Sequence, residues 1–285
     1  MQSSTALRIG KLHTNKLALT GLLVLALIAW LFPFYLLVIT SFKSGTEMVS
    51  GPLALPKALD FSAYVQAWNL LGLGGQLRNT FVYAFLGSFL ALALASIPAY
   101  ALGKFKIPGG RVIFVVLLSG MMLPQQIVVI PLFDLLASMK LSDTILGLIL
   151  VHGVYGMPFI LLILRGFVEN IPSELEDAAR VDGASDFGIL RHVIFPLVAP
   201  GAAISFTLNF MDIWREFFFA LVFLNSETNF PISLSMLKVT APEFFTTWNI
   251  PAATAIIAQL PLVILYVFAY RWITEGVFAG AIKGG

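Results

Sequence analysis

The sequence predicts an all-α, polytopic membrane protein with six transmembrane helices. Of its 285 residues, 59% are hydrophobic and 11% are charged, and the mean hydropathy is +0.92. Soluble domains are usually about half apolar and about one quarter charged. A helix needs roughly 20 mostly apolar residues to cross a bilayer. Six segments meet this requirement, at about 17–40, 81–102, 112–136, 145–164, 198–224 and 252–270.

A polar, basic tail at residues 1–16 precedes the first predicted span. A basic head followed by an apolar run is also the pattern of a signal peptide. The run that begins at Leu17 is too long for the hydrophobic region of a signal peptide, and it lacks a small-residue cleavage site at a suitable distance. We therefore expect residues 17–40 to be a span, and residues 17–285 to form one membrane domain.

The polar interval 41–79 contains an aromatic stretch at 61–71, FSAYVQAWNLL, which is typical of a helix at a membrane interface. We expect its aromatic side chains to pack at the outer face rather than to bind a ligand. The second span, 81–102, is rich in Ala, Gly and Ser. Small side chains allow helices to approach closely, so this span is expected inside the bundle.

Prolines interrupt the third predicted span at Pro124 and Pro131. A proline frees a backbone carbonyl, and such helices kink where a neighbour or a cavity satisfies it. Gln125 and Gln126 follow Pro124 directly, at what should be the middle of the membrane. The fourth span, 145–164, then returns the chain.

The fifth span, 198–224, carries Asn209, Asp212, Arg215 and Glu216. Polar groups in hydrocarbon are costly unless they meet partners or water. Gln125, Gln126, Asn209 and Asp212 are therefore candidates for the path of a hydroxylated solute, which needs donors and acceptors together. Two alternatives remain open: the amides bond only to neighbouring helices, and Asp212 pairs with Arg215 at i+3, with Glu216 at i+4 on the same helical face.

The interval 165–197 is polar and carries its own helix signals. Ser173 and Glu176 have the spacing of a capping box ahead of a short helix that ends at Val181. We expect Gly183 to take a positive φ at the end of this helix. Ser185 or Asp186 then caps a second short helix, which runs toward Pro196 and is expected to stop there.

The basic residues orient the chain. Six spans place both termini on one side, and intervals on that side hold most of the basic residues, so the positive-inside rule predicts that both termini and the 165–197 loop are cytoplasmic. On that side we count Arg8, Lys11, Lys16, Lys104, Lys106, Arg111, Arg165, Arg180, Arg191, Arg271 and Lys283. The opposite side holds Lys43, Lys57, Arg78, Lys140 and Lys238.

Catalytic machinery is not expected in this chain. It has no cysteine, its three histidines are scattered, and no Gly-Lys pair has the earlier glycine that a Walker A phosphate loop requires. The acidic residues between Glu174 and Asp182 are expected to form a solvated helix N-terminus. We also expect no metal site in the chain and no nucleic-acid partner.

The 165–197 loop resembles the EAA loop of ABC importer permeases. The family pattern runs E-x-A-A-x-x-D-G-A, a spacer and I-x-L-P, and it is matched here by residues 176–179, 182–184 and 193–196. The third block is looser, because Val193 and Phe195 replace the usual isoleucine and leucine. Resemblance to permeases of maltose-type carbohydrate importers extends to the stretches Phe32–Lys43, Ile97–Phe105, Leu123–Phe133 and Gly276–Gly284.

This resemblance implies the type I ABC importer transmembrane fold (MetI-like) in a bacterial or archaeal inner membrane. It implies a second permease chain, two copies of an ATPase subunit that bind ATP and Mg, and an extracytoplasmic solute-binding protein. The EAA loop would dock in a cleft of the ATPase. Residue by residue, the implied coupling set is Glu176, Ala178, Ala179, Asp182, Gly183 and Ala184.

One departure from the family lies in the fifth span. Relatives often carry W-N-[D/E]-F, whereas this chain has Trp214-Arg215-Glu216-Phe217. The arginine favours an anionic or strongly hydroxylated solute, or it pairs with Asp212. Sugars, polyols and glycerol phosphodiesters all pass through relatives of this type. An ion-coupled secondary transporter is the competing class, and the chain shows no internal repeat that would favour it.

Overall fold

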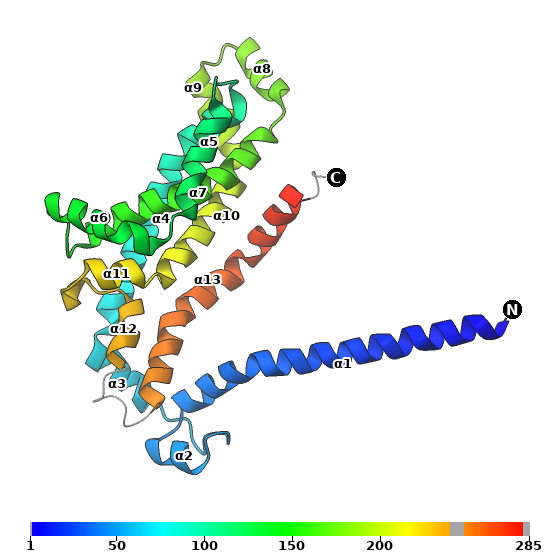
Figure 1. The fold of residues 1–285 in the computed structure, drawn as a ribbon, viewed down its shortest axis with the longest axis vertical. Helices are drawn as coiled ribbons and strands as arrows, with labels where there is room; N and C mark the ends of the chain where they lie inside the picture. Colours follow the sequence, from blue (N-terminus) through cyan, green and yellow to red (C-terminus); the bar gives the residue numbers. More distant parts are fainter. Residues whose placement is uncertain (1, 240–247, 282–285) are drawn as a thin grey trace. The chain divides into compact units, whose positions relative to one another are not determined.

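A computed structural model describes residues 2–239 and 248–281 (Figure 1). All regular elements in these two ranges are helices, which confirms the predicted all-α class. Five helices in the described part are long and apolar enough to cross a membrane, or six if one bent pair counts as a single span. Lys283, which contributes to the predicted orientation, lies outside the described residues.

The chain divides into two compact units. The first comprises Met1–Leu71 and Val239–Ile257, and the second comprises Gly72–Lys238 and Ala258–Gly285. Because the long last helix α13 (Asn249–Ala281) belongs to both units, each unit is described by itself.

The first unit contains α1 (Gln2–Ser41), α2 (Gly45–Ser50), α3 (Ser62–Leu71) and the start of α13. α1 runs without interruption from the predicted tail through the predicted span. The rings of Phe42, Phe61 and Tyr64 pack together at 5.2–6.0 Å, and the placement of 61–71 at the outer membrane face stays a prediction. Lys43 is buried beside them and donates to the carbonyls of Gly51 and Pro52, each at 2.8 Å.

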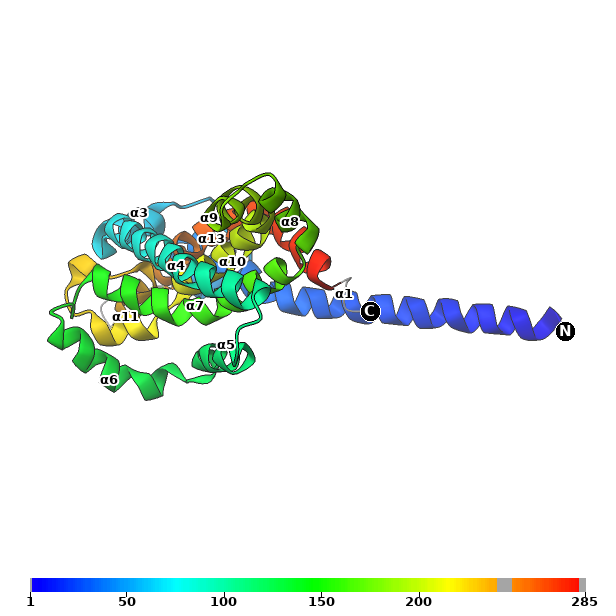
Figure 2. The ribbon, with the colours of Figure 1, turned by 90° about the horizontal axis from the view of Figure 1, so that it is seen from above.

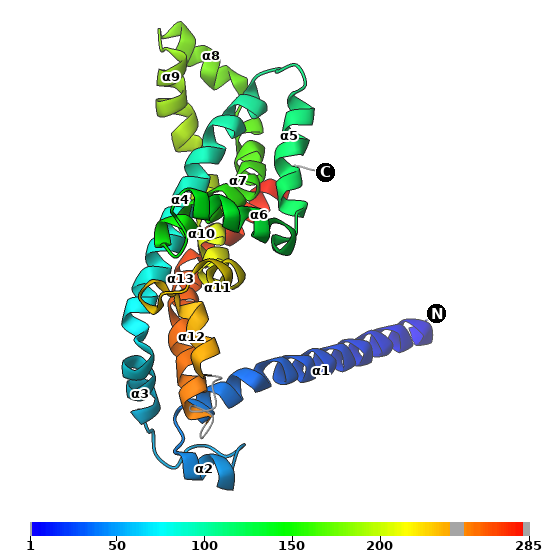
Figure 3. The same cartoon turned by 60° about the vertical axis from the view of Figure 1, so that its left-hand side comes forward.

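The second unit is built on α4 (Leu73–Lys104), α7 (Ile145–Glu169) and α10 (Phe195–Arg215), which pack against one another (Figure 3). Small residues allow this packing, as predicted for 81–102. Ala91, Ala95 and Ala99 are fully buried on α4. On α7, a Cβ added at Gly153 would lie only 2.4 Å from Cδ2 of Leu90.

The predicted third span, 112–136, is not one kinked helix. It consists of α5 (Gly110–Ser119), the short 3₁₀ helix η1 (Gly120–Met122) and α6 (Gln125–Ser138), with a bend of 95° (Figure 2). Pro124 has extended backbone at the bend. Tyr155 on α7 donates its hydroxyl to the Leu123 carbonyl at 2.6 Å, so a neighbouring helix compensates for the broken ladder.

The predicted fifth span, 198–224, also needs correction. Its helix starts earlier, because α9 (Asp186–Ile189), a π turn (Leu190–Ile194) and α10 form one continuous run. Pro196 therefore does not stop the second short helix: the turn ahead of it widens, and the Phe195 N–H bonds to the Leu190 carbonyl. The run ends at Arg215, and a separate short helix, α11 (Phe218–Phe223), follows.

Beyond α11 the chain forms a 3₁₀ turn, η3 (Glu227–Asn229), and α12 (Ile232–Val239). Asp143, which lies between α6 and α7, holds this region. Its carboxylate accepts the backbone N–H groups of Asn225 and Ser226 at 2.9 Å each, and the Ser226 hydroxyl donates to it as well. These hydrogen bonds, chiefly from Ser226, hold the pKa of the Asp143 carboxyl below its ordinary value.

Candidate functional site

A polar cavity of about 380 Å³ lies in the second unit, between α7, α10 and the bend ahead of α6. It brings together three of the four residues predicted for a solute path, namely Gln125, Asn209 and Asp212. The fourth, Gln126, is exposed and does not line it. The full lining is Met121, Gln125, His152, Tyr155, Gly156, Phe159, Leu208, Asn209, Asp212, Ile213, Arg215 and Glu216.

Asn209 bonds to neighbouring helices, which is one of the two alternatives for it, and it also borders the cavity. Its side-chain amide donates to the Ser88 hydroxyl on α4 at 3.0 Å, and the residue is 5% exposed. It packs on the bare backbone of Gly156, where a Cβ would lie 2.4 Å from Oδ1 of Asn209. Asn209 therefore ties α10 to α4 and α7 while it also lines the cavity.

Asp212 and Arg215 form an ion pair of 3.6 Å at the exposed edge of the cavity. This contact supports the pairing interpretation of the arginine. Glu216 does not join them, because α10 has ended at Arg215. The predicted arrangement of all three on one helical face is therefore wrong.

Glu216 turns inward instead. Its carboxylate accepts the Phe219 N–H at 2.8 Å, which starts α11, and lies 3.6 Å from Nε2 of His152. Both side chains of the His152–Glu216 pair are almost fully buried. Tyr83 closes the site from α4, with its ring 5.5 Å from that of His152 and its hydroxyl on the Ile213 carbonyl. Sequence reasoning missed this pair, although an acid ahead of the run FFFALV is a signal for a helix start.

The predicted coupling loop contains α8 (Ser173–Val181). The expected capping box is absent: Pro172 is the N-cap and no side chain caps the helix. Glu176 is buried and lies 2.7 Å from Nζ of Lys104, the last residue of α4. A buried cation on another helix holds the carboxylate, so Glu176 is not part of a solvated helix N-terminus.

Gly183 ends α8 with a φ of +85°, which confirms the predicted positive φ. The Gly183 N–H donates to the Arg180 carbonyl at 3.0 Å, and the Ala184 N–H donates to that of Ala179 at 2.9 Å. These two bonds are those of a Schellman motif. The Ser185 hydroxyl oxygen then accepts the Gly188 N–H at 3.2 Å and caps α9. Of the two residues predicted for this cap, Ser185 or Asp186, it is therefore Ser185.

The coupling residues divide into an outer and an inner group. Ala178, Asp182, Gly183 and Ala184 are exposed, whereas Ala179 is half-buried against the apolar core and Glu176 is buried. Figure 3 shows α8 and α9 at one end of the α4, α7 and α10 group. Four of the six predicted residues thus face outward at this end of the unit.

Three large apolar side chains extend the outer group, and sequence reasoning missed them. Leu175, Val181 and Phe187 are 44%, 88% and 69% exposed. They stand in an otherwise polar interval, and this contrast is the signal that could have identified them. Together with Ala178 and the Asp182–Ala184 turn, they form what we call the α8 face.

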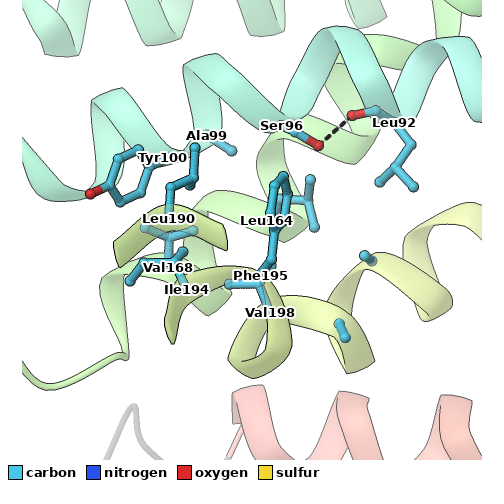
Figure 4. A pocket seen from close by; sticks show the side chains of 12 residues that line it. Leu92, Ser96, Ala99, Tyr100, Leu164, Val168, Leu190, Ile194, Phe195 and Val198 are labelled. Atoms are coloured by element: carbon cyan, nitrogen blue, oxygen red, sulfur yellow. Dashed lines mark hydrogen bonds between the residues drawn. The ribbon is translucent and has the colours of Figure 1, made fainter. Parts of the chain in front are cut away.

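A second cavity, of about 240 Å³, lies between α4, α7, the π turn and the start of α10 (Figure 4). Its walls are almost entirely apolar, with Leu164, Val168, Ile194 and Val198 among them. The hydroxyl of Ser96 is occupied by the Leu92 carbonyl at 2.6 Å. The lining of this cavity is therefore much less polar than that of the first.

Comparison with known proteins gives consistent matches. A family model described as binding-protein-dependent transport system inner membrane component matches residues 91–278. An inner membrane ABC transporter permease protein of Escherichia coli is 32% identical over 95% of this chain and 99% of its own length. A probable permease protein for starch degradation products from Thermoanaerobacterium thermosulfurigenes is 30% identical over 96% and 99%. Among solved structures, a bacterial ABC transporter involved in the import of the acidic polysaccharide alginate aligns with a TM-score of 0.78 and 27% identity, covering 88% of this chain and 94% of that chain.

Proposed function

The chain belongs to the family of binding-protein-dependent transport system inner membrane components, and from this premise we propose that it forms half of the path for a sugar or oligosaccharide. It is an integral membrane permease subunit with the ABC importer transmembrane fold, type I and MetI-like. The names of its relatives support the substrate class, since one is assigned to starch degradation products and the alginate transporter moves an acidic polysaccharide.

The polar cavity is the observation that carries this proposal. Amide, carboxylate, guanidinium and imidazole groups line one space inside an apolar helical unit. Hydrocarbon does not solvate such groups, so an aqueous cavity that accepts a polar solute explains their placement. A hydroxylated solute can donate to the two carboxylates and accept from the amide and guanidinium groups.

The α8 face is proposed as the surface that docks on an ATPase subunit. It combines small residues, a tight turn and three exposed apolar side chains, as a surface built for close protein contact does. Two ATPase copies would bind ATP and Mg, a second permease would complete the path, and an extracytoplasmic binding protein would deliver the solute. Both termini would then be cytoplasmic, as the basic residues indicate.

The matched pair Gln125→Leu and Gln126→Leu tests the solute path. The two amides are adjacent, but only Gln125 lines the cavity. The co-purifying binding protein is first screened against oligosaccharides, polyols and glycerol phosphodiesters, and the ligand found is then used in uptake assays. We expect Gln125→Leu to change uptake or solute preference at normal complex abundance, and Gln126→Leu to resemble wild type. Equal uptake in both variants would refute the cavity assignment, and a ligand outside the sugars would refute the substrate class.

A further inference from the structure

The Lys104–Glu176 ion pair joins the coupling loop to a membrane helix. The two charged groups are 2.7 Å apart, and their side chains are 11% and 7% exposed. The Lys104 ammonium also donates to the Ile171 carbonyl at 2.6 Å, just ahead of α8. Among the described residues it is the only salt bridge between α8 and α4, whereas the exposed Arg180–Asp186 pair, at 3.6 Å, joins α8 to the start of α9.

The ion pair is also favoured by the helix ends at which its two charges lie. Lys104 is at the C-terminus of α4 and Glu176 is in the first turn of α8, so each charge complements the dipole of its own helix. Oε1 of Glu176 is buried, and the Lys104 ammonium at 2.7 Å is its charged partner. Removing either partner leaves the other charge buried and unpaired, which is costly.

From Lys104, α4 runs to Ser88, which bonds to a residue of the cavity wall although α4 itself does not line the polar cavity. Its backbone is held tightly against α7, since a Cβ at Gly103 would lie 2.8 Å from Cγ1 of Val168. Further along α4, Ser88 accepts the hydrogen bond from Asn209, which lines the cavity. Packed helices and hydrogen bonds of this kind can carry energetic coupling between two sites.

We propose that Lys104 and Glu176 are positioning residues that transmit movement of α8 to α4 and so to the polar cavity. In this role the Glu176 carboxylate acts inside the permease, through its buried contact with Lys104. The inference rests on the proposed docking of the α8 face, and it adds a residue outside the EAA-like motif, Lys104, to the coupling machinery.

A cysteine reporter can test this transmission without knowledge of the solute. The chain has no native cysteine, so Asp212→Cys places one thiol at the exposed edge of the cavity. The full chain is purified with its ATPase subunits, and labelling by a membrane-impermeant maleimide is timed with and without ATP and vanadate. Lys104→Met, Glu176→Gln, the double change Lys104→Met/Glu176→Met and the conservative Lys104→Arg are compared in this background. Glu169→Gln is the matched control, because it breaks the more exposed ion pair with Arg165 on α7.

We expect a severalfold change in labelling rate on nucleotide trapping in the reporter protein, in Lys104→Arg and in Glu169→Gln. The change should vanish in Lys104→Met, Glu176→Gln and the double variant, while the ATPase still co-purifies. The double variant is decisive because it leaves no unpaired buried charge.

If the double variant assembles and keeps the nucleotide-dependent change in labelling rate, or fails to assemble at all, the transmission role is wrong. Loss of the change in Glu176→Gln but not in Lys104→Met would identify a direct ATPase contact and also overturn it. Failure of the docking proposal would give a different result, because the Asp212→Cys protein without any further change would then co-purify no ATPase.

Discussion

Substitution of Gly183 separates backbone strain from surface fit in the coupling loop. With a φ of +85°, the backbone there is in a region that costs an L-residue about 1 to 2 kcal/mol. No atom lies within 4 Å of an added Cβ, so the chain itself presents no steric obstacle. If the strained backbone relaxes to negative φ, the Schellman bonds to Arg180 and Ala179 are lost as well. A penalty of 1 to 2 kcal/mol would shift the population of the native turn by roughly 5- to 30-fold.

The series Gly183→Asn, Gly183→Ala and Gly183→Val distinguishes the two effects. Asparagine tolerates positive φ, alanine less so, and the β-branched valine least. If strain dominates, ATPase activity coupled to the binding protein should fall in the order Gly, Asn, Ala, Val. If close contact with the ATPase dominates, alanine should be the best tolerated because it is the smallest. Wild-type coupled ATPase activity in Gly183→Val, at equal complex abundance, would refute both the strain argument and the docking of this turn.

Three further predictions concern orientation, helix packing and pH. A cysteine at Ser185 should react with a membrane-impermeant thiol reagent only from the cytoplasmic side and one at Ser50 only from outside, and the reverse pattern would overturn the orientation. Gly153→Ala should lower the free energy of unfolding by about 1 to 3 kcal/mol, because the added methyl group overpacks on Leu90. Gly166→Ala on the same helix should not, since an added Cβ there meets no atom within 4 Å. Equal melting temperatures of the two variants would contradict this packing. Because the pKa of Asp143 is lowered in the folded chain, its contribution to stability is present above the unfolded pKa of about 3.9 and is lost as pH falls through the lower folded value. Thermal unfolding in detergent should therefore show a deficit for Asp143→Asn near neutral pH that shrinks in acid, and a deficit independent of pH would argue against the carboxylate.

Features that depend on local pattern were predictable from the sequence, and those that depend on distant partners were not. The positive φ of Gly183 and the Ser185 cap follow from chemistry within a few residues. The capping box at Ser173 fails because Lys104, far earlier in the chain, offers Glu176 a buried cation. A charged partner on another helix cannot be inferred from spacing around the loop.

The same distinction explains the broken spans. Apolar length predicts that residues 112–136 and 198–224 enter the membrane, but length says nothing about direction. The sharp bend at Pro124 is compensated by the Tyr155 hydroxyl, and the break after Arg215 is stabilised by Glu216 at the start of α11. Gln125 and Gln126 begin α6, where successive side chains point about 100° apart, so only one of them can face the cavity, and the direction of α6 after the bend selects Gln125.

The continuous helical run from α9 through α10 links the α8 face to the polar cavity. It extends from Asp186 beside the α8 face to Arg215 at the polar cavity, without a break in 30 residues. At a rise of about 1.5 Å per residue, such a run spans roughly 45 Å. The π turn at Leu190–Ile194 is the irregular part of it and borders the apolar cavity between α4 and α7. Because sharp helix kinks occur at π-bulges and at prolines, we expect the run to bend at this turn, which Pro196 and Pro200 follow. Displacement at the α8 face would then reach the cavity along two helices, α4 through Lys104 and α10 through the π turn. The hydrogen bond between Ser88 and Asn209 holds these two helices together at the cavity wall.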